Sequence, residues 1–193
     1  MTKDDAAQIT AITQGTEEKI QVVYADTDTL SSFMNRNSFE YFMKVFETLG
    51  AEVILSKAVY HELCNGNKKE IRKATVKQLE RSKRITVVDI EPFTEVADTY
   101  LELSERMGKG EASALAFAKH STKKTVVASN NMSDVAAYAK EHSIELWPTA
   151  KILEEAIKLQ IINMNQANTL WIKMKEDGLK LPSYNTFEEY CKR

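Results

Sequence analysis

The chain has 193 residues, with 43% hydrophobic and 28% charged side chains and only three prolines and six glycines. This balance excludes an intrinsically disordered protein, and the length predicts one domain, residues 21–193, behind a polar N-terminal extension of residues 1–20. The net charge of −2 argues against a protein that coats nucleic acid without specificity. No apolar stretch approaches the roughly 18 residues needed to span a bilayer, and the N-terminal residues lack the basic and apolar regions of a signal peptide. We therefore expect a cytoplasmic protein that does not contact membranes.

Short apolar runs alternate along the chain with segments of helical spacing. The runs are rich in β-branched residues and have the length of strands: 22–25, 53–55, 85–90, 125–128 and 144–147. Strands that alternate with helices predict an α/β fold, in which a mostly parallel sheet of about five strands is flanked by helices in a three-layer sandwich.

The helical segments carry recognisable start and stop signals. Ser38 can cap the helix that ends before Gly50, and Pro92 suits the first position of a helix whose apolar stripe runs from Phe93 to Met107. Such stripes are most simply core. Ser56 can start a helix after the second strand, and four more helices are predicted at 111–119, 133–142, 149–160 and 165–177.

Two aspartates, Asp26 and Asp28, follow the first predicted strand directly. Ligands collect at the carboxyl ends of parallel strands. Like charges a few ångströms apart raise one another's pKa unless a cation lies between them, so this pair suggests a divalent metal. The two cysteines and three histidines show no zinc spacing, which leaves oxygen atoms as the metal ligands.

Three further acids fall at comparable places, Glu62, Glu111 and Asp134. An acid in the first turn of a helix commonly does no more than interact favourably with the helix dipole. That explanation suits Asp134 well and Glu111 fairly well, but it suits Glu62 poorly. It does not explain Asp26 and Asp28 together.

Three motifs carry these acids in order: "VVYADTDTL" from residue 22, "VILSKAVYHEL" from residue 53 and "GKGEASALAFA" from residue 108. Together they resemble the PIN domain family of metal-dependent ribonucleases, and the third motif is similar to the branch that uses Gly-Glu-Ala. The C-terminal run 148–182 also resembles that branch. The resemblance implies a PIN-like sandwich over roughly residues 22–182.

By this resemblance, Asp26, Glu62 and Glu111 hold Mg²⁺ or Mn²⁺ over the scissile phosphate of single-stranded RNA, and Asn131 or Asp134 completes the cluster. The metal lowers the pKa of a bound water for in-line attack, so no protein nucleophile is required. The implied catalytic residues are Asp26, Glu62, Glu111 and Asp134.

One position departs from the family pattern. Where relatives usually have an aspartate after the fourth strand, this chain reads Ser129, Asn130 and Asn131. An amide oxygen can coordinate a cation but brings no charge, so the site should hold metal more weakly. Asp134 could compensate or could simply cap its helix, and Asp28 could restore the missing charge.

A basic segment at 68–84 contains eight Lys or Arg residues and two acidic residues. It is either a solvated helix face or a path for the RNA backbone. The residues expected to bind RNA are Lys68, Lys69, Arg72, Lys73 and Lys77.

Two alternative functions compete with the ribonuclease. A degenerate PIN domain would bind RNA or a protein without cleavage, which Asn131 favours. A phosphatase of the haloacid dehalogenase superfamily also has an Asp-x-Asp after its first strand, but here Thr29 and Leu30 follow one residue too early. Many relatives in the PIN branch are toxins restrained by an antitoxin protein, and homodimers are common among them, so the resemblance implies such partners.

Overall fold

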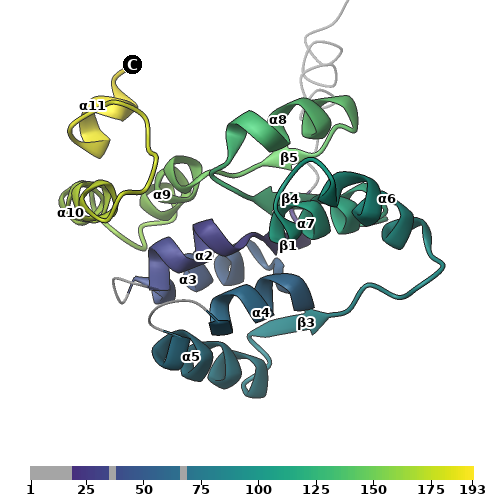
Figure 1. Ribbon diagram of the computed structural model, residues 1–193. Helices are drawn as coiled ribbons and strands as arrows, with labels where there is room; N and C mark the ends of the chain where they lie inside the picture. Colours follow the sequence, from purple (N-terminus) through teal and green to yellow (C-terminus); the bar gives the residue numbers. More distant parts are fainter. Residues whose placement is uncertain (1–18, 35–37, 66–68) are drawn as a thin grey trace, which may run out of the picture.

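The computed structural model describes residues 19–34, 38–65 and 69–193, with the side chains of Lys69, Ile71 and Asp134 left out. Within these residues, five strands form one sheet in the order β3-β2-β1-β4-β5 (Figure 1). All four neighbouring pairs are parallel, which confirms the predicted parallel sheet. The strands are β1 (Val22–Ala25), β2 (Glu52–Ser56), β3 (Ile85–Val88), β4 (Thr125–Ala128) and β5 (Glu145–Leu146). The third and fifth are shorter than the apolar runs predicted.

Helices connect the strands and cover both faces of the sheet (Figure 1). Most of them match the predicted segments, but α2, directly after β1, and the short α11 were not predicted. The helices are α2 (Thr27–Met34), α3 (Phe39–Leu49), α4 (Lys57–Asn65), α5 (Lys69–Arg81), α6 (Glu95–Ser104), α7 (Lys109–Lys119), α8 (Met132–Glu141), α9 (Thr149–Lys158), α10 (Met164–Glu176) and α11 (Phe187–Cys191).

Alternate residues of β1 face opposite sides of the sheet, and helices cover each side, which gives three layers. Val23 and Ala25 belong to a hydrophobic cluster with α3, α9 and the other helices of one face. Val22 and Tyr24 belong to a second cluster with α6, α7 and α8 on the opposite face. Because both faces of a strand are covered, every residue of β1 is buried, and the strand therefore appears in the sequence as a continuous apolar run.

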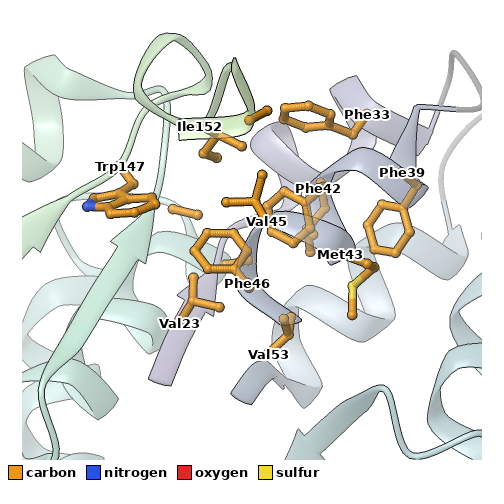
Figure 2. Close-up of a cluster of buried hydrophobic side chains, with 14 of the residues drawn as sticks. Val23, Phe33, Phe39, Phe42, Met43, Val45, Phe46, Val53, Trp147 and Ile152 are labelled. Atoms are coloured by element: carbon orange, nitrogen blue, oxygen red, sulfur yellow. The ribbon is translucent and has the colours of Figure 1, made fainter. Parts of the chain in front are cut away.

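Aromatic side chains form the centre of the larger cluster. Phe42 and Phe46 of α3 lie with ring centroids 4.9 Å apart, and Phe46 lies 5.6 Å from Trp147, which follows β5 (Figure 2). Val23 and Val53 of the sheet face the same rings. These contacts join α3 to the strands whose ends carry the candidate site.

The structure corrects one predicted helix start and the capping of another. The helix expected from Pro92 begins at Glu95, because the Thr94 hydroxyl accepts a hydrogen bond from the Ala97 N–H at 3.1 Å and so caps the helix. Phe93 therefore lies outside the helix, fully exposed with φ +61°, and is not core. Ser38 does precede α3, but its hydroxyl donates to the Phe33 carbonyl at 2.9 Å rather than capping the helix.

Candidate active site

The candidate site lies where the order of the sheet reverses. From β1 the chain passes to β2 and β3 on one side of the sheet, whereas β4 and β5 lie on the other side. Such a switch point leaves a crevice outside the carboxyl ends of the two central strands, and this is where open parallel sheets bind ligands. Asp26 directly follows β1, and Ser129 directly follows β4.

Asp26 is a buried carboxylate with a single hydrogen-bonded oxygen. Its backbone N–H donates to the Ala128 carbonyl at 3.0 Å, which holds the residue against β4. Its Oδ1 accepts from the Thr29 N–H at 2.8 Å and caps α2, the helix that was not predicted. The side chain is only 1% exposed, and Oδ2 has no hydrogen-bond partner among the described residues.

Burial changes the acidity of this group. Loss of water around the carboxylate raises the pKa of Asp26 to about 6, although hydrogen bonding by Ser129 and Thr29 favours the charged form and the nearby Asp28 disfavours it. Asp28 itself is exposed in the first turn of α2. A carboxylate with this pKa and an unused buried oxygen is stabilised by a neighbouring cation.

Glu62 of α4 is brought to the same edge by Thr27, the residue after Asp26. The Thr27 hydroxyl donates a hydrogen bond to Glu62 Oε2. A Cβ placed on Gly110 would lie 3.0 Å from the same oxygen and 3.1 Å from the Thr27 hydroxyl. The missing side chain of Gly110 therefore allows Glu62 to lie against the start of α7, next to Glu111.

A chain of hydroxyls holds the starts of α4 and α7 together. Ser113 donates to the Gly110 carbonyl at 2.7 Å, and its oxygen lies 2.6 Å from the Ser56 hydroxyl, which therefore donates to Ser113. Ser56 in turn accepts from the Val59 N–H at 3.2 Å and starts α4, as predicted. These buried contacts position Glu62 and Glu111 relative to each other.

Glu111 is linked to Asn131, the residue that departs from the family pattern. Its Oε1 accepts from the Asn131 side-chain amide at 2.9 Å, and its Oε2 accepts from the Gly108 N–H at 3.2 Å. The Asn131 Oδ1 accepts from the Ser133 hydroxyl at 2.8 Å. Asn131 thus replaces repulsion between two carboxylates with a hydrogen bond to Glu111.

Hydrogen bonds thus link Glu62 to the residue after Asp26 and Glu111 to the residues after β4, but these acids do not form a ready metal cage. Among the described side chains, no group of three His, Cys, Asp or Glu residues is placed to hold a metal ion. The side chain of Asp134, in the first turn of α8, lies outside the described residues. Oxygen atoms of the kind that Mg²⁺ and Mn²⁺ prefer as ligands are present, and among them Asp26 Oδ2 has no hydrogen-bond partner in the described residues.

Two pockets have residues of this edge in their lining. One, of about 900 Å³, is lined by Asp28 and Asn131 and by residues 177–182. The other, of about 810 Å³, is lined by Glu62, Lys57 and Lys109. Asp28 thus belongs to one hollow and Glu62 to the other, and each hollow is large enough for part of a ligand.

Comparison with known proteins identifies the family. The sequence matches the model of a PIN domain family over residues 21–188. The chain belongs to the PIN domain family. PIN domains are nucleases as a family, so this membership indicates nuclease chemistry and argues against the phosphatase alternative.

One solved structure similar to this PIN domain is described as DNA-bound VapBC from Salmonella typhimurium. It has 15% sequence identity and a TM-score of 0.48, and the match covers 67% of this chain and 98% of that chain. At this level the similarity carries no inference about activity. No curated protein matches the sequence.

The basic helix of this PIN domain lies apart from both pockets. Arg72, Lys73 and Lys77 are on α5, and none of the described residues of α5 lines either pocket. Lys68 and the side chain of Lys69 lie outside the described residues. RNA binding by this helix stays a prediction.

Sequence reasoning did not predict that neutral residues position the acids, although it did place Ser56 at the start of its helix. Thr27, Ser56, Gly110 and Ser113 contact Glu62 or the start of α7. Gly110 stands inside the Gly-Glu-Ala motif, so its lack of a side chain was a usable signal. The spacing of the Ser and Thr residues in the sequence does not distinguish them from hydroxyl residues that only cap helices.

Proposed function

We propose that this PIN domain is a Mg²⁺- or Mn²⁺-dependent endoribonuclease that hydrolyses phosphodiester bonds in single-stranded RNA. The observation that supports it most is the buried Asp26, which keeps one oxygen unpartnered at the switch point of the sheet. A group of this kind costs stability at neutral pH, and retaining it is explained by binding a cation.

The residues proposed to hold the metal are Asp26, Asp28, Glu62, Glu111, Asn131 and Asp134. When bound, the ion would supply a water of lowered pKa and stabilise the charge that develops on the phosphate. Thr27 and Asn131 each donate to one of the glutamates, so they hold these carboxylates at the edge of the site. Each carboxylate has further lone pairs, so these hydrogen bonds and a metal contact would be compatible.

Cleavage of a labelled single-stranded RNA tests this function. We expect endonucleolytic products with Mg²⁺ or Mn²⁺ and none in excess chelator, because the proposed nucleophile is a metal-activated water. A chromogenic phosphomonoester provides the contrast, since a nuclease of this type should leave it intact. Cleavage that persists in chelator would remove the metal-dependent mechanism.

A degenerate domain that binds RNA or a protein without cutting is the second candidate. Two observations favour it: Asn131 brings no charge, and the described side chains include no group of three metal-binding residues. In a degenerate domain no metal would bind, and the hydrogen bond from Asn131 to Glu111 would remain in place.

Titration with Mn²⁺ by calorimetry separates these two functions. The nuclease should bind Mn²⁺, and Asp26→Asn should weaken that binding by about tenfold or more, because the buried carboxylate would be a direct ligand. Asp98→Asn, at an exposed aspartate of α6 that lines neither pocket, removes the same charge and should not change the affinity. No binding to the wild-type protein would favour the degenerate domain.

The proposed partners follow from the PIN resemblance. A toxin role would require an antitoxin protein that covers the acidic edge, and a homodimer would agree with what is common among relatives. None of the helices in the described part of the chain has the length and apolar character to cross a membrane. We propose a cytoplasmic location.

A further inference from the structure

The 900 Å³ pocket next to the acids has a wall that the active-site motifs do not include. On one side it is lined by Asp28 and Asn131, which also belong to the candidate site. On the other side it is lined by residues 177–182, which follow α10.

The C-terminal wall is held in one conformation. Gly178, with φ +86°, ends α10, and the Leu179 N–H donates back to the Met174 carbonyl at 3.0 Å. Further along, the Tyr184 carbonyl accepts from Trp171 Nε1 at 3.0 Å and from Lys175 Nζ at 2.8 Å. The wall is therefore preorganised, and a ligand would not have to order it.

The pocket lining combines apolar and polar side chains. Leu179, Leu181 and Pro182 form part of the C-terminal wall. Met132, at the start of α8, also lines the pocket and is 43% exposed. The polar lining includes Asn131, Ser31, Asn130 and Ser133. Flat rings with apolar faces and hydrogen-bonding edges suit such a surface.

Charge decides which part of a nucleic acid belongs inside. Asp28 and Asp177 line the pocket, so it disfavours a phosphate in its interior. Lys180 is the one cation among the described lining residues. It is exposed and forms no ion pair with any residue that the structure describes. A phosphate at the rim would contact this amine.

We propose that this pocket binds one nucleobase of a single-stranded nucleic acid next to the scissile phosphate, and that Lys180 positions the adjoining phosphate. This inference rests on the proposed nuclease function, because only a nuclease has a scissile phosphate. Binding of the nucleic acid can still be measured without cleavage. A nucleic acid is favoured over a peptide because Asp28 and Asn131, two of the residues proposed to hold the metal, line the pocket, and Lys180 supplies a cation for a phosphate.

Binding of a fluorescent single-stranded RNA in excess chelator tests the proposal directly. Lys180→Glu is expected to weaken binding by about tenfold, because it places repulsion where a phosphate contact was. Lys180→Gln should also lower the slope of log Kd against log salt by about 0.7, the value for one lost phosphate contact on a single strand. Met132→Ala should weaken binding by about threefold or more through lost contact with the base.

Matched controls come from the same chain. Lys140→Glu changes an exposed lysine at the far end of α8 that lines neither pocket. Ile172→Ala shortens a side chain of α10 that is 40% exposed and lines neither pocket. Both controls should bind RNA as the wild type does.

Methyl NMR locates the base independently of activity. With labelled methionine methyl groups, RNA should shift the Met132 signal, whereas the buried Met43 of α3 should not move. In a cleavage assay, Lys180→Gln should raise KM about tenfold with kcat within about twofold, because a positioning contact acts on binding.

The outcomes separate this proposal from the nuclease. RNA binding that depends on Lys180 and Met132, without any cleavage in Mn²⁺, supports the base pocket and overturns the nuclease. Cleavage with unaltered binding and KM in these variants overturns the base pocket and leaves the nuclease. The base pocket is also overturned if the wild type binds no RNA, or if adding RNA does not shift the Met132 signal. An unshifted Met132 signal would fit a pocket for a peptide.

Discussion

Replacing Asp26 by asparagine should abolish RNA cleavage without destabilising the protein. Activity should fall by roughly a thousandfold or more, because the proposed metal loses its buried anionic ligand. The Thr29 N–H can still donate to the asparagine carbonyl, so the cap of α2 is retained. Circular dichroism and urea denaturation of the metal-free proteins would show whether the fold is intact.

The pH dependence of stability should distinguish the wild type from this variant. The folded pKa of Asp26, about 6, lies above its ordinary value of 3.8, so the folded state holds this proton more tightly than the unfolded state. The free energy of unfolding should therefore fall as pH rises from about 4 to above 6, by on the order of 3 kcal/mol from this group. Asp26→Asn should lack this component, and part of its gain at pH 7 should be offset by a newly buried amide N–H.

Asp98→Asn is the control for these measurements, since it should retain cleavage and the wild-type pH profile. The mechanism would be contradicted by an Asp26→Asn protein that cuts RNA at the wild-type rate. An unfolded Asp26→Asn protein would instead contradict the view that this carboxylate costs stability at neutral pH.

Replacing Trp171 by alanine should have the largest effect on stability. Trp171 is fully buried in the same hydrophobic cluster as the sheet and lies against Phe187 and Tyr190 of α11. Its loss should cost about 3–5 kcal/mol through the cavity left behind. It should also remove one of the two hydrogen bonds to the Tyr184 carbonyl and loosen the wall of the base pocket, so RNA binding should weaken as well.

Urea denaturation followed by two probes measures this cost. A single transition that moves as a whole would agree with one domain that includes the C-terminal helices. Ile172→Ala, at the neighbouring exposed position, should change stability by less than about 0.5 kcal/mol. Separate melting of α10 and α11 in Trp171→Ala, with the sheet intact, would contradict the single domain.

Local sequence features predicted an element where burial or backbone conformation restricts the residue type. β1 is buried on both faces, so its residues had to be apolar without interruption, and this made the strand visible. The end of α3 was visible because Gly50 adopts a left-handed conformation, which glycine tolerates best. The helix after β3 was placed too early, because Pro92 and Thr94 both suit a helix start and only the hydrogen bond to Ala97 decides between them.

The sequence by itself determined the order of the strands and acids along the chain. Through its family motifs it also determined the class of chemistry to expect. These are properties of residue type and spacing. Only the tertiary structure decided that Thr27 holds Glu62, that Gly110 leaves room for it, and that Asn131 bonds to Glu111. It also decided that residues 177–182 form a wall beside the acids. The physical reason is that such contacts depend on distances between segments far apart in the chain, and short polar side chains satisfy many local partners equally well until packing selects one.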